Sequence, residues 1–268
     1  MIPIMVTGAG RSGTTFLMRL LASHPDVLAD EAHPLEFRPF LLSLFPADPI
    51  CQGSTLFRLL NNRVLTTDEA LEFYHSAAAA GERAPHYFAE KMPGLNVDRI
   101  LERFPDARII CLLRDPRDVH MSAVEFNHRR GGEGKFGEFE DATERDIVFN
   151  FAKTFYRLLA IADVYRHNTS TLYYEHLMDE RARATLANLF AWLGIAADGD
   201  TVRGVLGRAR SHTVEEHRTK LSDAATVGRW RYEMPVSMMR LYRDEMGEML
   251  EVMGYPLKAE FPECHPRP

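Results

Sequence analysis

The chain has 268 residues, 46% of them hydrophobic, which is enough for one substantial core. It carries 32 basic and 38 acidic residues and a net charge of −6, so no global positive field favours a nucleic acid as partner. Three scattered cysteines predict neither a disulfide framework nor a zinc site and favour a cytoplasmic protein. No apolar run approaches the roughly 20 residues of a membrane span. We therefore expect a single soluble domain over residues 1–268.

Apolar segments along the chain predict strands that alternate with helices. The continuous apolarity of ARIICLL (Ala107–Leu113) is typical of a strand that is buried on both faces of a parallel sheet. The alternation predicts an α/β fold, with a doubly wound, mainly parallel sheet and ligands at the carboxyl ends of the strands. The expected elements are strands at 2–7, 86–90, 107–113 and 171–174, and helices at 14–23, 97–104, 118–126, 144–166, 182–193 and 236–253. Irregular surface loops are expected at 131–140 and 221–228.

A glycine-rich turn, GAGRSGTT (Gly8–Thr15), follows the first strand. It keeps the frame of a loop that points successive backbone N–H groups at phosphate ahead of a helix. Thr14 replaces the lysine that reaches the β and γ phosphates in such loops, while Arg11 offers a fork of donors to a tetrahedral anion. The loop therefore predicts an anion site that is not built for a triphosphate. The alternative is a simple strand-to-helix turn with a solvated Arg11.

A second charged motif, RDPRDVHMS, follows the third predicted strand. Pro116 and Asp118 suit a helix start, which puts Arg114 at the strand end and Ser122 about two turns into the helix. Arg114 and Ser122 can then converge on one anion. The alternative is that the acidic residues of the motif only cap the helix.

Together, GxGRSGTT and LLRDPRDVxxS resemble the sulfotransferase family. The resemblance implies a P-loop, nucleotide-kinase-like sulfotransferase fold with extra helices. It also implies an enzyme that moves a sulfuryl group from 3′-phosphoadenosine 5′-phosphosulfate (PAPS) to a hydroxyl acceptor, releases 3′-phosphoadenosine 5′-phosphate (PAP) and needs no metal. Arg114 and Ser122 would bind the 3′-phosphate. The residues implied at the 5′-phosphosulfate are Arg11, Ser12, Gly13, Thr14 and Thr15.

Three further segments resemble family elements. In LYYEHL, Tyr174 would contact adenine, although a strand-end aromatic is often part of the core. In AEKMP, Lys91 would face the transferring sulfuryl group; the alternative is an ordinary charge pair with Glu90. TVGRWR would close over the 3′-phosphate, and the residues implied there are Thr226, Gly228, Arg229 and Trp230.

An acceptor hydroxyl needs a general base, and Glu31 is the first candidate. SHPDVLADEAHP is most similar to the tyrosylprotein and bacterial small-molecule branches, and in the tyrosylprotein branch a glutamate pair follows the loop helix. The second member of that pair falls on Ala32 in this chain, so His33 and Glu36 are further candidates. The cytosolic branch uses a histidine further along, which leaves other histidines open.

Two other functions fit parts of the pattern. A P-loop nucleotide kinase agrees with the loop and the sheet, but Thr14 argues against it. A non-catalytic module that binds an adenine nucleotide is the second, because fold does not determine function. For a sulfotransferase, the acceptor is a small molecule, a carbohydrate or a tyrosine. The Phe- and Leu-rich region 33–64 and the loop at 131–140 predict a partly apolar acceptor pocket.

Overall fold

The computed structural model describes residues 1–30, 38–92, 96–129, 143–211 and 226–257. Contacts group the chain into two compact units. Unit 1 is Met1–Gly8, Ser12–Leu113 and Leu158–Arg218. Unit 2 is Ala9–Arg11, Arg114–Arg157 and Thr219–Pro268. The expectation of a single domain stays a prediction.

The core of unit 1 is a five-stranded sheet in the order β2-β3-β1-β4-β5, in which every pair of neighbours is parallel. All but the first and last residues of β1 are buried, as expected for a strand covered on both faces. The prediction of a doubly wound parallel α/β sheet is confirmed. The strands are β1 (Ile2–Gly8), β2 (Val27–Ala29), β3 (Tyr87–Lys91), β4 (Arg108–Leu113) and β5 (Thr169–Tyr173).

Strand register brings the predicted motifs to one edge of the sheet. Val6 pairs with Lys91, and Gly8 pairs with Leu112. After β1 the chain forms β2 and β3 on one side of that strand and then β4 and β5 on the other. The carboxyl end of β1 is therefore the topological switch point, where open α/β sheets bind ligands.

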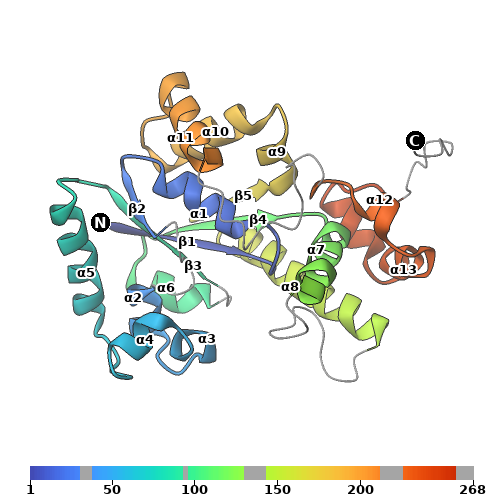
Figure 1. Cartoon of the computed structure of the whole chain (residues 1–268), viewed down its shortest axis with the longest axis horizontal. Coiled ribbons are helices and arrows are strands. Elements are labelled where there is room, and N and C mark those ends of the chain that lie inside the picture. Colours follow the sequence, from blue (N-terminus) through green and yellow to red (C-terminus); the bar gives the residue numbers. More distant parts are fainter. Residues whose placement is uncertain (31–37, 93–95, 130–142, 212–225, 258–268) are drawn as a thin grey trace. The chain divides into compact units, whose positions relative to one another are not determined.

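Helices of unit 1 cover both faces of this sheet (Figure 1). On one face, alternate strand residues such as Ile4, Val6 and Ala89 join a core cluster with α1 (Thr14–Ala22), α10 (Ala182–Leu193) and α11 (Gly199–Ser211). On the other face, Phe88 stacks on Tyr74 at 4.2 Å between ring centroids. The remaining helices of this unit are α2 (Pro39–Leu44), α3 (Pro49–Gln52), α4 (Thr55–Leu59), α5 (Thr67–Ala80), α6 (Val97–Arg103) and α9 (Tyr174–Met178).

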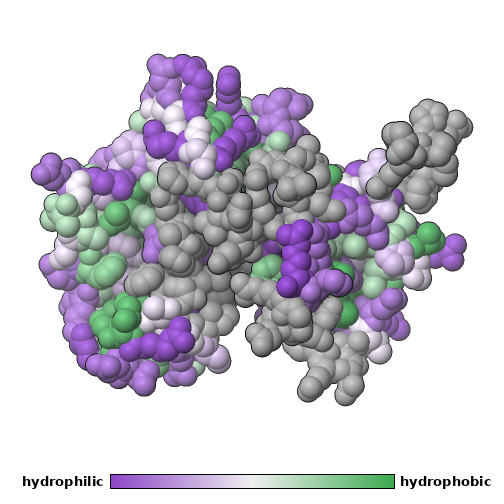
Figure 2. All heavy atoms as spheres, in the orientation of Figure 1, coloured by the Kyte–Doolittle hydropathy of each residue, from purple (hydrophilic) through white to green (hydrophobic). Residues whose placement is uncertain are grey.

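Local sequence signals explain where several of these helices begin and end. Thr66 and Glu69 form a reciprocal capping box at the start of α5. Gly194, in a left-handed conformation, ends α10. Hydrophilic residues cover α10 and α11 at the top of Figure 2, where α11 exposes Arg203 and Arg210.

Unit 2 is helical. α8 runs on from this unit into unit 1, and α12 packs on α7. No helix in the described part of the chain is both long and apolar enough to cross a membrane. The helices are α7 (Pro116–Arg129), α8 (Glu144–Val164), α12 (Trp230–Glu233) and α13 (Val236–Val252).

Candidate active site

The phosphate loop, Gly8–Thr15, takes a shape that only glycine permits at two positions. Gly13 has φ +96° and caps α1. A Cβ there would lie 2.4 Å from the ring of Tyr174, and a Cβ on Gly8 would lie 2.8 Å from the Leu112 carbonyl oxygen. Because both positions face fixed atoms, the loop keeps its backbone tightly against the sheet and leads directly into the N-terminus of α1, the end of a helix that favours anions.

Polar side chains of this loop lie on unit 1. Ser12 is fully buried, and its Oγ has no hydrogen-bond partner among the described residues. Lys91 Nζ, at the end of the neighbouring strand β3, donates to Thr15 Oγ1 at 3.4 Å. The ammonium that Thr14 cannot supply is thus placed beside the loop by strand pairing. A buried hydroxyl and a nearby ammonium fit a phosphate or sulfuryl oxygen.

Tyr174 is the first residue of a helix, not the last residue of a strand. β5 ends at Tyr173, so the predicted strand 171–174 is wrong at its last residue, and Tyr174 begins α9 instead. The Tyr174 side chain is 8% exposed and packs in the core cluster against Gly13. Its neighbour Tyr173 is half-buried and tilted over His176, with 5.2 Å between ring centroids. The role of Tyr174 at adenine stays a prediction.

Glu90 is the residue before Lys91, and it is a buried anchor rather than a surface charge. Its carboxylate accepts the Phe40 N–H at 2.7 Å, the Leu41 N–H at 2.8 Å and the Tyr74 hydroxyl at 2.6 Å. Burial raises the pKa of Glu90 to about 7, although these hydrogen bonds oppose the shift. Glu90 therefore fixes the start of α2.

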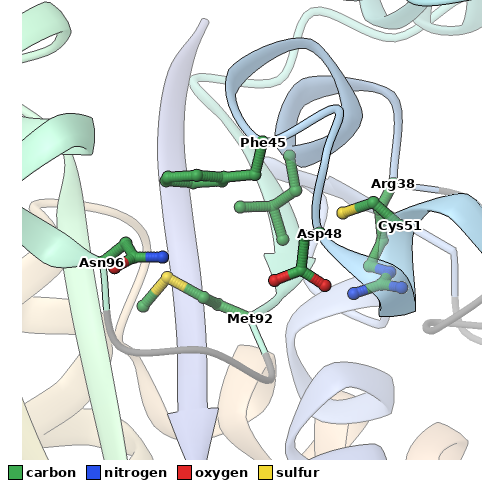
Figure 3. Close-up of a pocket in the computed structure, with 7 residues that line it drawn as sticks. Arg38, Phe45, Asp48, Cys51, Met92 and Asn96 are labelled. Carbon is green, nitrogen blue, oxygen red and sulfur yellow. The ribbon is translucent and has the colours of Figure 1, made fainter.

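A small pocket lies next to this anchor (Figure 3). Its cavity measures about 10 Å³, which is room for one water molecule. Met92, which directly follows Lys91, contributes to the wall. The residues that line the pocket are Arg38, Leu41, Phe45, Asp48, Cys51, Met92 and Asn96.

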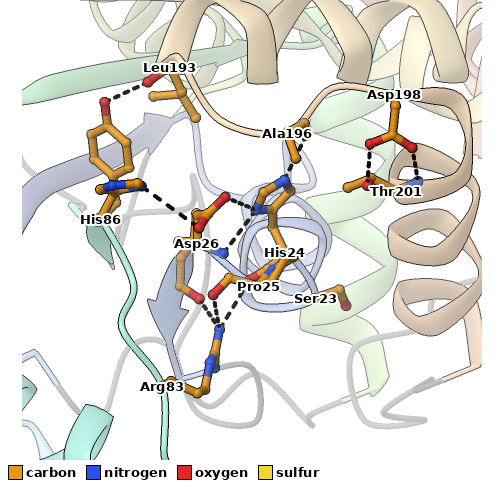
Figure 4. A network of polar contacts seen from close by, with 12 residues as sticks. Ser23, His24, Pro25, Asp26, Arg83, His86, Leu193, Ala196, Asp198 and Thr201 are labelled. Carbon is orange, nitrogen blue, oxygen red and sulfur yellow. Dashed lines mark hydrogen bonds and ion pairs between the residues drawn. The ribbon is translucent and has the colours of Figure 1, made fainter.

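The turn after α1 is held by a polar network around His24 (Figure 4). His24 is buried; its Nδ1 accepts the Asp26 N–H at 3.1 Å, and its Nε2 lies 2.9 Å from the Ala196 carbonyl oxygen. Arg83 Nη2 donates to the carbonyl oxygens of His24, Pro25 and Val27. Both ring nitrogens of His24 are committed to structure, so it is a poor choice as general base.

Arg11 and Arg114 lie together in unit 2. Arg11 has φ +69°, a left-handed conformation that is unusual for a residue with a side chain. Its guanidinium lies 4.3 Å from the ring centroid of Phe126. Arg114 Nη1 donates to the Arg11 carbonyl oxygen at 2.7 Å, and Nη2 donates to that of Thr226 at 2.6 Å. Arg114 therefore fixes two backbone segments that the sequence predicted to bind the cofactor.

Arg229 and Trp230 are both buried in unit 2. Arg229 Nη2 forms ion pairs at 2.6 Å with Glu125 and Glu233, while its Nη1 has no hydrogen-bond partner among the described residues. Trp230 is 1% exposed, with the Arg117 guanidinium 3.6 Å from its ring centroid. Its ring is thus part of the packing of this unit.

The predicted site residues divide between the units. Ser122 is buried within α7. Glu31, His33 and Glu36 lie outside the described residues, and their roles stay predictions. Across the described residues, no group of three His, Cys, Asp or Glu side chains is placed to hold a metal ion. Unit 1 carries Ser12, Gly13, Thr14, Thr15, Lys91 and Tyr174, and unit 2 carries Arg11, Arg114, Ser122, Thr226, Gly228, Arg229 and Trp230.

Sequence reasoning missed the anchoring roles of Glu90 and Asp118. Both belong to the motifs, but Glu90 was considered only as a charge pair with Lys91, and Asp118 only as part of a helix start. The signal available for Glu90 was its place at the end of the apolar run YFA, inside a strand whose first four residues are buried. For Asp118, nothing near it in the sequence identifies its partners.

Known proteins with a matching sequence pattern or a similar fold include sulfotransferases. The model of the sulfotransferase family matches residues 3–199. The sulfotransferase domain from the curacin biosynthetic pathway has a similar fold, with a TM-score of 0.59, 17% identity and coverage of 96% of this chain and 98% of that one. The sulfotransferase from Alicyclobacillus acidocaldarius gives a TM-score of 0.58 at 17% identity, covering 96% of this chain and 97% of the other.

Mouse sulfotransferase SULT7A1, whose structure is complexed with PAP, gives a TM-score of 0.55 at 16% identity, covering 94% of this chain and 88% of the mouse chain. No relative was found among proteins of curated function. Since the family model spans well over half of the sequence, the chain belongs to the sulfotransferase family and is a sulfotransferase.

Proposed function

We propose that this sulfotransferase takes its sulfuryl group from PAPS and transfers it to the hydroxyl of a partly apolar acceptor. The observation that carries the proposal is the phosphate loop, which has Thr14 at the lysine position and has Thr15 3.4 Å from Lys91 on the neighbouring strand. In this proposal, the loop amides bind one phosphate, and the Lys91 ammonium stabilises the charge that develops during transfer. The PAP complex of the mouse protein of similar fold supports the same donor.

We assign the predicted site residues to the two anionic ends of PAPS. Ser12, Gly13, Thr14 and Thr15 would hold the 5′-phosphosulfate, for which the buried Ser12 Oγ is a donor with no partner among the described side chains. Arg11 belongs to the same loop and would add its guanidinium. In unit 2, Arg114, Ser122, Thr226, Gly228, Arg229 and Trp230 would form the 3′-phosphate site.

The reaction needs positioning and charge stabilisation more than covalent catalysis, by analogy with phosphoryl transfer. The acceptor oxygen forms a bond to sulfur as the bond from sulfur to the 5′-phosphate oxygen breaks in line, and the bonding pair leaves with PAP. Lys91 and Arg11 oppose the negative charge on the oxygens. The acceptor proton passes to a base, for which Glu31, His33 and Glu36 are the candidates.

The acceptor side is proposed to lie along region 33–64. The composition of this region supports the proposal: Leu41 and Phe45 are apolar, and they lie near Met92, which directly follows Lys91. The cavity in Figure 3 has room for only one water molecule, so it is not itself the acceptor pocket. Apolar side chains close to Lys91 would suit an acceptor with an apolar body. Buried free thiols at Cys51 and Cys111 support a reducing, cytoplasmic setting.

Calorimetric titration with PAP, with and without Mg²⁺, and separately with Mg·ATP tests the donor. We expect PAP to bind without metal and Gly13→Ala to abolish that binding, because its Cβ would meet the Tyr174 ring. Gly207→Ala is the matched control: its Cβ meets nothing within 4 Å, and this helical position should gain about 0.5–1 kcal/mol of stability.

Turnover of PAPS with a panel of hydroxyl acceptors tests the chemistry. Lys91→Ala should lower kcat about a hundredfold to a thousandfold, as expected for loss of a group that stabilises transition-state charge. The exposed Lys153→Ala on α8 should not change it. Tight binding of Mg·ATP that competes with PAP, together with no turnover of PAPS, would favour a P-loop kinase instead. Full turnover of PAPS by Lys91→Ala would contradict only the role of Lys91. Binding of PAP without turnover of any acceptor would favour a non-catalytic module.

A further inference from the structure

One carboxylate ties residues 226–230, here called the Trp230 segment, to the start of α7. Asp118 Oδ2 accepts the N–H of Gly228 at 2.6 Å, and its Oδ1 accepts the N–H of Trp230 at 3.0 Å. Asp118 is 0% exposed, so both bonds are shielded from water. Hydrogen bonds to a buried charge are among the stronger ones in proteins.

Other members of the same motif hold the segment at further points. Asp115 accepts from Arg117 Nε at 2.9 Å and from Nη2 at 2.7 Å, which fixes the guanidinium that lies 3.6 Å from the Trp230 ring centroid. Arg114 Nη2 binds the Thr226 carbonyl oxygen at 2.6 Å. The motif RDPRD is therefore a platform on which this segment is built.

Gly228 gives the segment the turn that this contact requires. It has φ +70°, a conformation that residues with side chains rarely adopt. The residues on either side of Arg229 can thereby direct their N–H groups to the two oxygens of a single carboxylate. Glycine at position 228 is therefore the residue type that this left-handed turn favours.

The charge of Asp118 makes a direct contact with phosphate unfavourable. A carboxylate next to an anion site repels the anion, and this one also lies near Asp115, which adds to the effect of burial in raising its pKa to about 6. Both of its oxygens are occupied by backbone N–H groups. We therefore explain a carboxylate at this position by the two backbone N–H groups that it holds, not by contact with the ligand.

We propose that Asp118 is a positioning residue for the 3′-phosphate site: by accepting the Gly228 and Trp230 N–H groups, it fixes the Trp230 segment against α7, the helix that carries Ser122. The identity of the ligand rests on the proposed function. The anchoring itself rests only on the contacts above. Asp118 does not touch the phosphate, and it acts on nucleotide binding through the Trp230 segment.

The test compares Asp118→Ala and Asp118→Asn with Asp146→Asn, which alters an exposed first-turn carboxylate of α8. All are made in a Trp192→Phe background, so that Trp230 is the only tryptophan. We expect Asp118→Ala to shift Trp230 emission to longer wavelength and to raise the Kd for PAP and the KM for PAPS about tenfold to a hundredfold, with kcat little changed. Asp118→Asn, whose amide oxygen still accepts one N–H, should lie between, and Asp146→Asn should match the parent.

A merely structural role would lower Tm and the yield of active enzyme but leave the KM for PAPS of the folded fraction unchanged. That result, or unshifted Trp230 emission in both Asp118 variants, overturns the inference. If Asp118→Ala fails to fold, the KM measured with Asp118→Asn decides. Failure of the parent enzyme to bind PAP would contradict the proposed function, whereas parent-like PAP binding by Asp118→Ala would contradict only the role of Asp118.

Discussion

Glu90 in unit 1 and Asp118 in unit 2 both hold a distant backbone segment in place, but the segments that they hold differ in kind. Each is a buried carboxylate that accepts two backbone N–H groups from a distant segment. Glu90 also accepts a hydroxyl from Tyr74, whose ring stacks on Phe88 in the core. Asp118 accepts hydrogen bonds from the Trp230 segment. This segment follows residues 212–225, which lie outside the described part of the chain.

The difference teaches that a buried acid contributes to stability or to binding according to what it holds. Glu90 joins strand β3 to helices α2 and α5, so its loss should mainly lower the free energy of unfolding. Asp118 joins α7 to the Trp230 segment, so its loss should mainly weaken binding of the ligand. The two anchors can therefore be separated by experiment.

The largest effect is expected from Glu90→Ala. It leaves two buried N–H groups and one hydroxyl without their acceptor and opens a cavity, which should cost about 3–5 kcal/mol in the free energy of unfolding. Urea unfolding measures it, with the exposed Glu102→Ala on α6 as control. The affinity of the folded variant for PAP should stay within about threefold of wild type. A cost below about 1 kcal/mol would break the contrast with Asp118.

A change of pH should have a smaller effect on the free energy of unfolding. Burial raises the pKa of Glu90 from 4.5 to about 7 and that of Asp118 from 3.8 to about 6. An acid with a raised pKa binds its proton more tightly in the folded state, so its contribution to stability is full below the unfolded pKa and is lost as the pH rises to the folded one. The free energy of unfolding should thus fall between about pH 4.5 and 7 through Glu90, and between about pH 3.8 and 6 through Asp118.

Glu90→Gln and Asp118→Asn assign this pH dependence. Urea unfolding at pH values from about 5 to 8 should show a flatter profile between about pH 6 and 7 for Glu90→Gln, but not for Asp118→Asn. The difference from wild type removes the contributions of other titrating groups, such as His176, whose pKa is lowered. A wild-type profile that rises relative to Glu90→Gln across this window would reverse the sign and contradict the assignment.

The smallest effect is expected from Tyr74→Phe, which removes one donor to Glu90 and keeps the ring. The stability cost should be about 1 kcal/mol, the usual net value of one hydrogen bond. Because the Tyr74 hydroxyl lowers the pKa of Glu90, its removal should move the pH window of Glu90 upwards. The exposed Tyr232→Phe is the control. A cost as large as that of Glu90→Ala would mean that Tyr74, not Glu90, is the principal anchor.

Long periodic segments made much of the fold predictable from sequence. The helix expected at 182–193 is α10, and the apolar run at 107–113 is β4. The three-residue β2 and the short helices α2, α3 and α4 carry too little pattern to be recognised. α11 was also missed, because glycines at 199, 204 and 207 lower its intrinsic helix propensity, and burial of Val205 and Leu206 outweighs that cost.

Motif positions were predictable in the site, but their contacts were not. Gly8 and Gly13 followed from the loop pattern, since the chain must turn sharply from strand to helix there. The partners of Asp118 lie 110 and 112 residues away, and Leu41 lies 49 residues from Glu90. Such pairings depend on how segments pack, which local periodicity does not encode.

Because Glu90 and Lys91 are adjacent in β3, this strand should not tolerate the insertion or deletion of a residue. Neighbouring residues of a strand point to opposite faces, so β3 sends an acid into one layer of helices and a cation towards Thr15 in the other. Inserting or deleting one residue within β3 would exchange the two faces and place a cation in the core. Insertions are tolerated in surface loops, but this strand has a fixed length.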